Sequence, residues 1–225
     1  MRNTTTQTTA LHDRLRDDIV YGRLEPGQKL KVESLQERYG AGATPLREAL
    51  SLLVSTGMVE RLEQRGFRVA EISMEDFEET FWTRCFLEER ALHESIVQGG
   101  PDWEGRIVLA LHHLRRFPPG ASFADDTEEE NWEKIHAEFH RALISGCPSR
   151  VLLRFCAQLY DANRRYRHIA RLTPRSRGNA LSEHEQIGAA ALARDVETAT
   201  RLLIQHYTRT GDLLRSQISR CKKSA

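Results

Sequence analysis

The chain has 225 residues, of which 29% are charged and 40% hydrophobic, the balance of an ordinary soluble globular protein. Its N-terminus is polar, unlike a signal peptide, and it has no run of about 18 apolar residues, so we expect no membrane span. The net charge of +1 excludes nucleic-acid binding through bulk basic charge, and residues 1–70 contain 11 Lys and Arg against 9 Asp and Glu. The four cysteines include no CxxC pair, which favours free thiols in a reducing cytoplasm over a disulfide framework.

The first 72 residues have the pattern of three short helices followed by a β-hairpin. Apolar residues recur at helical spacing in three segments, which are 10–22, 32–39 and 44–57. A Pro26-Gly27 pair separates the first segment from the second. Thr44 and Pro45 are expected to be the N-cap and the first residue of the third helix. Two β-like segments around Gln64-Arg65-Gly66 then predict a hairpin with a glycine at its tip.

From Ser73 onward strand signals vanish, and the pattern predicts only helices. Ser73 is expected to cap the first of them, with Glu75 and Asp76 in its first turn. The predicted helices cover about 73–98, 102–116, 127–145, 149–171, 180–193 and 195–218. The expected divisions of the chain are a disordered lead-in (1–9), an N-terminal domain (10–72), a helical domain (73–219) and a tail (220–225).

Only a few residues, including Gly40, separate the second and third helices, which is the spacing of a helix-turn-helix, and the hairpin would form its wing. The expected fold class is mainly α, with an N-terminal winged helix-turn-helix and a C-terminal all-α helical bundle or barrel. The third helix would lie in the major groove of double-stranded operator DNA, where Arg47 can contact a guanine or a phosphate. The alternative is an inert domain in which Arg47 pairs with Glu48 or Glu37. The expected DNA-binding residues are Arg38, Thr44, Pro45, Arg47, Arg65 and Gly66.

Two histidines of the helical domain have a spacing that suits a metal site. His136 and His140 lie four residues apart on a predicted helix, which places both imidazoles on one face. His184 and His206 lie on two later helices, which an antiparallel pairing would bring together. The alternative is that these histidines are solvated or hydrogen-bonded without a metal.

Several motifs of the N-terminal domain together resemble the GntR family of transcription regulators. They are Leu24-Glu25-Pro26-Gly27, Ser34-Leu35, Thr44-Pro45-Leu46-Arg47-Glu48-Ala49-Leu50, Gly57-Met58-Val59 and Arg65-Gly66-Phe67-Arg68-Val69. The resemblance implies a winged helix, a homodimer and a near-palindromic operator. The family usually carries Ser-Arg before the Thr-Pro pair, and Gly42-Ala43 stands there in this chain, so one DNA-contacting arginine is missing.

The helical domain resembles the FCD ligand-sensing domain of the FadR subfamily. The matching residues are Arg84, Leu87-Glu88, Phe139-His140-Arg141-Ala142-Leu143, Glu183-His184, Ile187, Ala190, Asp195, Ala199 and His206. The resemblance implies a divalent metal inside a helical barrel, with an organic acid effector completing its coordination. His140, His184 and His206 match three of the four ligands, and His136 stands where the family has Asp. Four imidazoles suit zinc or nickel.

The effector is expected to be a small carboxylate, a group that guanidinium binds well. The candidates for holding it are Arg84, Arg164 and Arg165, each of which has a salt bridge as its alternative role. We therefore predict a cytoplasmic, ligand-responsive regulator that is not an enzyme. Two alternatives stay open, namely a metal-dependent sensor without an organic effector and a metalloenzyme whose metal activates water.

Overall fold

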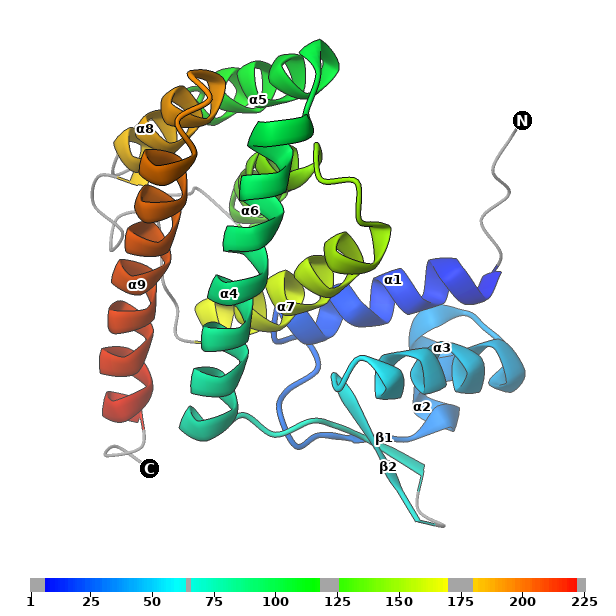
Figure 1. Ribbon diagram of the computed structural model, residues 1–225. Helices are drawn as coiled ribbons and strands as arrows, with labels where there is room; N and C mark the ends of the chain where they lie inside the picture. Colours follow the sequence, from blue (N-terminus) through cyan, green and yellow to red (C-terminus); the bar gives the residue numbers. More distant parts are fainter. Residues whose placement is uncertain (1–6, 64–65, 118–125, 170–179, 222–225) are drawn as a thin grey trace. The chain divides into compact units, whose positions relative to one another are not determined.

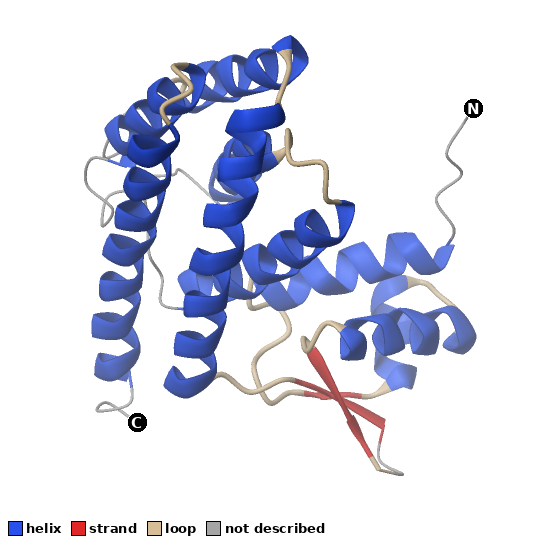
Figure 2. Cartoon of the chain, viewed as in Figure 1, coloured by secondary structure: helices blue, strands red, loops and turns tan. Residues whose placement is uncertain are grey.

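The computed structural model describes residues 7–63, 66–117, 126–169 and 180–221 of the chain. Helices account for most of these residues, and a small three-stranded sheet accounts for the strands among them (Figure 2). The described residues divide into two compact units. The N-terminal unit contains the residues up to Phe77 together with Asp161–Ile169, and the C-terminal unit contains Glu78–Tyr160 and the residues from Ala180 onward. In the part of the chain that the structure describes, no helix combines the length and the apolar composition needed to cross a membrane.

The N-terminal unit is built mainly from three helices and an antiparallel sheet (Figure 1). Its elements are α1 (Gln7–Val20), β1 (Lys29–Leu30), α2 (Val32–Tyr39), α3 (Ala43–Ser55), β2 (Val59–Leu62) and β3 (Gly66–Val69). The strand order is β1-β3-β2, with Lys29 opposite Arg68 and Val59 opposite Val69. Helix α1 begins three residues before its predicted start. Strand β1 was not predicted, because two residues are too short for an alternating pattern and their extended conformation depends on pairing with β3.

The turn between α2 and α3 has the predicted spacing, but α3 begins earlier than expected. Gly40 ends α2 with a φ of 63°, a left-handed conformation that glycine adopts without steric cost. The N-cap of α3 is Gly42, whose carbonyl accepts a hydrogen bond from the Leu46 N–H at 3.3 Å, so the prediction that Thr44 is the N-cap is wrong. Pro45 is therefore the third residue of the helix. It is tolerated there because the first N–H groups of a helix have no intrahelical partner.

An apolar core fixes α3 within the N-terminal unit. Leu15 of α1 and Leu50 of α3 have no exposed surface, and Phe67 of β3 packs in the same cluster. Each such side chain stabilises the fold by roughly 1.5–3 kcal/mol relative to leaving it exposed. The helix turns this apolar face inward, and Thr44 and Arg47 are consequently exposed on its other side.

The C-terminal unit is helical throughout its described residues. It contains α5 (Pro101–Leu114), α6 (Asp126–Ile144), α8 (Ala180–Leu192) and α9 (Val196–Cys221). It also contains α4 (Met74–Gln98) from Glu78 onward and α7 (Arg150–Ile169) as far as Tyr160. The start of α4 confirms the predicted cap, since Ser73 Oγ accepts a hydrogen bond from the Asp76 N–H at 2.9 Å. Helices α4 and α9 run side by side (Figure 1), and the Arg215 guanidinium of α9 donates to Glu78 of α4 at 2.6 Å.

A second apolar core holds the C-terminal unit together. Its largest fully buried side chain is Trp103 of α5, whose Nε1 donates to the Leu143 carbonyl of α6 at 3.0 Å. Helices α8 and α9 form a hairpin in which Arg194 adopts a φ of 60°, and Asp195 Oδ1 then accepts a hydrogen bond from the Thr198 N–H at 3.0 Å. This hairpin brings polar side chains of α8 and α9 against those of α6, beside the apolar core.

Candidate metal centre and nucleic-acid interface

Four buried histidines converge inside the C-terminal unit. Helix α6 contributes His136 and His140, α8 contributes His184 and α9 contributes His206, and none of these residues is more than 5% exposed. One ligand atom from each lies within 4.8 Å of the others, and the Nε2 atoms of His136 and His140 are 3.2 Å apart. The predicted pair on one helix and the two later histidines therefore form a single cluster.

A phenol or a carboxylate contacts the Nδ1 atom of three of these histidines. The distances are 3.0 Å from Tyr160 to His136, 3.0 Å from Tyr207 to His140 and 2.7 Å from Glu183 to His206. Hydrogen bonding to His206 lowers the pKa of Glu183, so its carboxylate is ionised. Metal-binding histidines typically hold such partners on one ring nitrogen, which leaves the other nitrogen to face the metal.

A buried chain of hydrogen bonds extends from His140 to an arginine of α4. The Tyr207 hydroxyl donates to a Glu88 carboxylate oxygen, so its own oxygen accepts the hydrogen bond from Nδ1–H of His140. Arg84 Nε donates to the other oxygen of Glu88 at 2.7 Å, so the salt bridge expected as the alternative role of Arg84 is present. Burial raises the pKa of Tyr207 well above its ordinary value, so the hydroxyl keeps its proton. This series of hydrogen bonds thus fixes His140 in the tautomer whose Nε2 carries a lone pair.

The arrangement of the quartet fits a divalent metal ion. The Nε2 atoms of His136 and His140 face each other at 3.2 Å, a distance at which one neutral imidazole can donate a hydrogen bond to the other or both can direct lone pairs at one cation. The nitrogens are buried, and the Nδ1 partners orient the rings as they do around known metal ions. Four nitrogen donors, with His136 in the fourth position, match the preference of a borderline metal.

The three arginines predicted to hold an effector carboxylate fall in different units. Arg84 belongs to the C-terminal unit, where it is buried and paired with Glu88. Arg164 and Arg165 belong to the end of α7, which is grouped with the N-terminal unit. There Arg165 donates a hydrogen bond to the Ala70 carbonyl. Arg164 and Arg165 therefore belong to a different compact unit from Arg84 and the histidine quartet.

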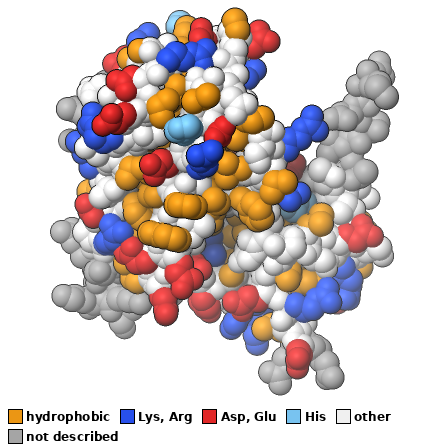
Figure 3. Space-filling model, in the orientation of Figure 1, with side chains coloured by type: hydrophobic (Ala, Val, Ile, Leu, Met, Phe, Trp, Pro, Cys, Tyr) orange, Lys and Arg blue, Asp and Glu red, His pale blue; other side chains and the backbone are white. Residues whose placement is uncertain are grey.

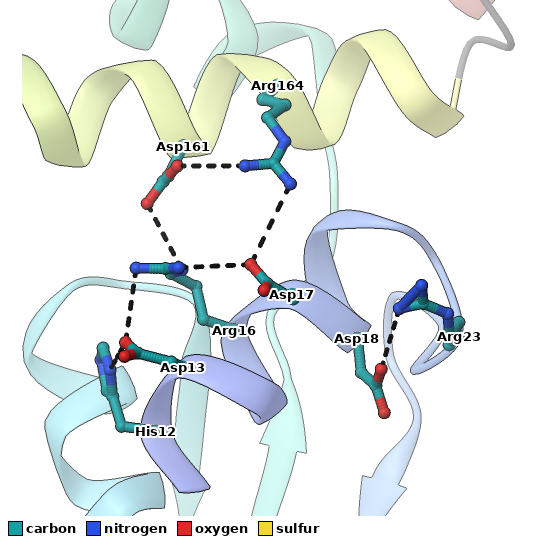
Figure 4. A network of polar contacts seen from close by, with 8 residues as sticks. All are labelled: His12, Asp13, Arg16, Asp17, Asp18, Arg23, Asp161 and Arg164. Carbon is teal, nitrogen blue, oxygen red and sulfur yellow. Dashed lines mark hydrogen bonds and ion pairs between the residues drawn. The ribbon is translucent and has the colours of Figure 1, made fainter. Parts of the chain in front are cut away.

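Arg164 lies in a network of charged side chains that joins the end of α7 to α1 (Figure 4). Its guanidinium is 3.8 Å from Asp161 and 4.0 Å from Asp17. Arg16 of α1 bridges the same two carboxylates, at 3.7 Å from Asp161 and 3.2 Å from Asp17. Alternating positive and negative groups at these distances satisfy one another, so Arg164 forms the salt bridges that the sequence leaves open as its alternative role.

A groove of about 520 Å³ lies between α3 and the sheet of the N-terminal unit. Arg47, Arg61 and Lys31 line it together with one carboxylate, that of Glu33, so its charged side chains are mainly basic. Arg61 donates to Ser51 Oγ at 3.1 Å, which holds its guanidinium beside α3. Among the residues that the structure describes, none forms an ion pair with Arg47, so the alternative that Arg47 pairs with Glu48 or Glu37 is not observed.

The other predicted DNA-binding residues have different surroundings. Thr44-Pro45 lies at the start of α3, where the threonine is exposed. Gly66 begins β3 with a φ of 90°, a conformation that few other residues adopt. Arg38 pairs with Asp18 at 2.8 Å, so a phosphate would have to compete with a carboxylate for it. Arg65 lies outside the described residues.

Sequence reasoning missed several residues that complete these two sites. Arg61 and Lys31 carried no signal, because the groove that they line forms only when the strands pair. Glu183 and Tyr207 are sequence neighbours of two predicted ligands, but each contacts a histidine on a different helix. Adjacent helical residues point about 100° apart, so adjacency to a ligand is a weak signal for its partner.

Comparisons with known proteins identify the families of both halves of the chain. Residues 7–69 match the family described as bacterial regulatory proteins, gntR family, and residues 79–209 match the FCD domain. The chain is 40% identical over 198 residues to the uncharacterized HTH-type transcriptional regulator BphR of Paraburkholderia xenovorans, covering 88% of this chain and 80% of that protein. It is 34% identical over 196 residues to the HTH-type transcriptional repressor GlaR of Escherichia coli, covering 85% and 88%.

Solved structures share the fold. McbR/YncC of E. coli superposes with a TM-score of 0.79 at 22% identity, covering 95% of this chain and 99% of that chain. A GntR-type regulator from Rhodococcus sp. RHA1 superposes with a TM-score of 0.73 at 21% identity, covering 93% and 98%. The matching families and relatives are regulators of transcription and not enzymes, which removes the metalloenzyme alternative. The chain belongs to the GntR family of bacterial transcription regulators, with a winged helix-turn-helix that binds DNA and an FCD ligand-binding domain.

Proposed function

We propose that His136, His140, His184 and His206 hold one divalent metal ion, and that the regulator responds to a small carboxylate at this centre. The convergence of four buried imidazoles carries the proposal. Zinc or nickel suits a set of four nitrogen donors. When bound, the ion would supply a Lewis-acidic position that attracts the anionic group of the effector.

The residues around the quartet orient its imidazoles. Glu183 and Tyr207 each fix the Nδ1 side of one histidine, as the distances of 2.7 and 3.0 Å support. We assign Arg84 a positioning role, because its partner is Glu88 and its influence reaches His140 through Tyr207. The contacts of Arg164 and Arg165 support a structural role in the N-terminal unit for both.

The groove beside α3 is proposed to contact operator DNA in the cytoplasm. Exposed basic side chains on one side of a helix-turn-helix can reach phosphates and base edges. Arg61 and Lys31 extend the surface expected from the sequence. The proposed DNA-binding residues are Lys31, Arg38, Thr44, Pro45, Arg47, Arg61, Arg65 and Gly66.

A homodimer would present two DNA-binding units to the half-sites of a near-palindromic operator. Helix α4 offers a surface for it, since Trp82 and Phe86 are 68% and 62% exposed and their rings stack 5.9 Å apart. Hydrophobic side chains gather over α4 on the face drawn in Figure 3. Exposed aromatic patches of this kind mark interaction surfaces.

The dimer is tested with Trp82→Glu, and Val108→Glu serves as the control because Val108 is 55% exposed on α5. Sedimentation velocity at micromolar concentration should find a dimer for the wild type and the control, and a monomer for Trp82→Glu, because a buried carboxylate opposes association. A wild-type monomer would remove the dimer, and a dimeric Trp82→Glu variant would move the interface elsewhere.

Helix α7 offers a route from the quartet to the DNA-binding unit through consecutive residues. Tyr160 contacts His136, and the next residue, Asp161, contacts Arg16 of α1. An effector that shifts α7 would change the placement of α1. It would thereby change the fraction of dimers able to span both half-sites, which is a population shift.

The metal is tested by elemental analysis of the tag-free protein. The wild type should hold about one divalent ion per chain, as expected for a single four-ligand site. His140→Ala should lose it, whereas the control His112→Ala should keep it because His112 is exposed on α5. Stoichiometric metal in both His140→Ala and His206→Ala would place the metal elsewhere.

The second candidate function is a metal-dependent sensor without an organic effector. Four imidazoles can complete a tetrahedral site by themselves, and such a site has no open position for an effector. Operator affinity measured against metal concentration separates the two functions. A large change with metal alone, and none on adding carboxylates to the metal-loaded protein, would favour the pure metal sensor.

A further inference from the structure

A largely apolar cavity of about 230 Å³ lies beside the histidine quartet within the C-terminal unit. His140 is one of its lining residues, so the cavity adjoins the proposed metal centre. Ile144 and Leu153 give it aliphatic walls from α6 and α7, and Cys156 lies on α7 with 1% exposure. Ala157 is exposed on the same helix and gives the cavity a side open to solvent.

Cys156 and Glu88, two buried residues of this wall, offer little to a polar ligand. Burial raises the pKa of Cys156 to about 12, so its thiol is neutral and behaves as a small apolar group. Glu88 also lines the cavity, but its carboxylate already accepts hydrogen bonds from Arg84 and Tyr207.

Tyr160 and Ser145 also line the cavity, but the Tyr160 hydroxyl already contacts His136. Ser145 Oγ already accepts a hydrogen bond from Arg106, while Arg141, a further lining residue, is exposed. A hydroxyl-rich ligand would therefore replace few of the hydrogen bonds to water that it loses here.

The volume limits the size of the occupant. The cavity is smaller than the sites that hold drug-sized ligands, whose volumes are about 300–1,000 Å³. A short aliphatic chain or a single small ring fills such a space.

We infer that the effector is a monocarboxylate with a compact apolar body, which lies in the cavity walled by Ile144, Leu153 and Cys156 while its carboxylate faces His140. The inference rests on the proposed function, because the quartet supplies the anchor for the carboxylate. It adds the chemical class of the rest of the ligand. A short hydroxy acid of similar charge would place its carboxylate at the metal centre but would gain no apolar contacts from the cavity.

The test is calorimetric titration of the metal-loaded wild type with acetate, propionate, butyrate and pentanoate, and with glycolate as the polar comparison. Each buried methylene should tighten Kd about fourfold until the cavity is full. Glycolate should bind no better than acetate. Equal affinities along the series, or tighter binding of glycolate, would overturn the inference.

Two cavity variants locate the effect. Cys156→Phe fills the space and should reduce the gain per methylene to less than about twofold, whereas Val151→Phe on the exposed side of α7 should leave the series unchanged. If Cys156→Phe does not fold, Ile144→Ala enlarges the cavity and should move the tightest binding to a longer acid. A chain-length dependence that neither cavity variant alters would place the apolar body elsewhere.

A neutral probe separates this inference from the proposed function. If no carboxylate binds the metal-loaded protein, the proposed function fails, and benzene binding is then measured by ligand-observed NMR. Benzene bound by the wild type and not by Cys156→Phe would still support a site for an apolar body. Absence of benzene binding to the wild type would overturn the inference as well.

Discussion

Replacing Tyr207 by phenylalanine removes one oxygen atom from the series of hydrogen bonds that joins His140 to Arg84. In the wild type this oxygen accepts the hydrogen bond from His140 Nδ1–H at 3.0 Å, and its proton goes to Glu88. Tyr207 is only 3% exposed, so water does not readily take the place of the hydroxyl. The variant therefore leaves His140 without this acceptor and Glu88 without one of its donors.

Both losses have measurable sizes. Removing an outer partner of a metal-binding histidine weakens metal affinity by about 10- to 100-fold, because the ring is no longer held in the binding tautomer. The free energy of unfolding of the metal-free protein should fall by about 1–3 kcal/mol, because buried polar groups lose a partner. Competition with a chromophoric chelator measures the metal affinity, and urea denaturation of the metal-free protein measures the stability.

Tyr166→Phe is the matched control. Its hydroxyl also donates to a carboxylate, that of Asp76, but within the N-terminal unit. This variant should lose stability in the same range and keep the metal affinity of the wild type. If the metal affinity of Tyr207→Phe is within about twofold of that of Tyr166→Phe, the orientation of His140 does not depend on the hydrogen bond to Tyr207, and the prediction is refuted.

Three further perturbations test other parts of the molecule. Arg61→Ala should weaken binding to a DNA duplex that the wild type selects from random sequences. The slope of the logarithm of the binding constant against the logarithm of the salt concentration should fall in magnitude by about 0.9, the contribution of one phosphate contact. If fluorescence anisotropy finds an unchanged slope, Arg61 does not contact the DNA. Asp161→Asn should lower the free energy of unfolding by less than about 1 kcal/mol, because its ion pairs with Arg16 and Arg164 are long, at 3.7 and 3.8 Å. Both arginines also keep Asp17 as a partner. The loss of stability should vanish in urea denaturation at about 1 M salt, and persistence there would argue against a charge effect. The pKa of Cys156 is raised to about 12, so its reactive thiolate is scarce near neutral pH. Mass spectrometry after treatment with an alkylating reagent should find Cys156 modified only in the unfolded protein. Rapid alkylation of Cys156 in the native protein would contradict its burial.

Local sequence patterns predicted the helices well but missed strand β1 and misplaced the start of α3. The apolar spacing placed α2 at 32–39, and Ser73 capped α4 as expected, because both signals act within one or two turns. Strand β1 was missed because its conformation depends on pairing with β3. The start of α3 was misplaced because the extended backbone of Gly42, rather than a side chain, forms its N-cap.

The sequence by itself determined the winged helix, the helical domain and the pairing of His136 with His140, because helical periodicity and turn chemistry are encoded in residues close along the chain. Only the tertiary structure decided that His184 and His206 join that pair, since they reach it through the α8–α9 hairpin. It also decided that Arg164 packs in the N-terminal unit, because the end of α7 belongs to that unit. Convergence of distant side chains depends on which helix surfaces pack together, and that choice is made by the whole core rather than by any local segment.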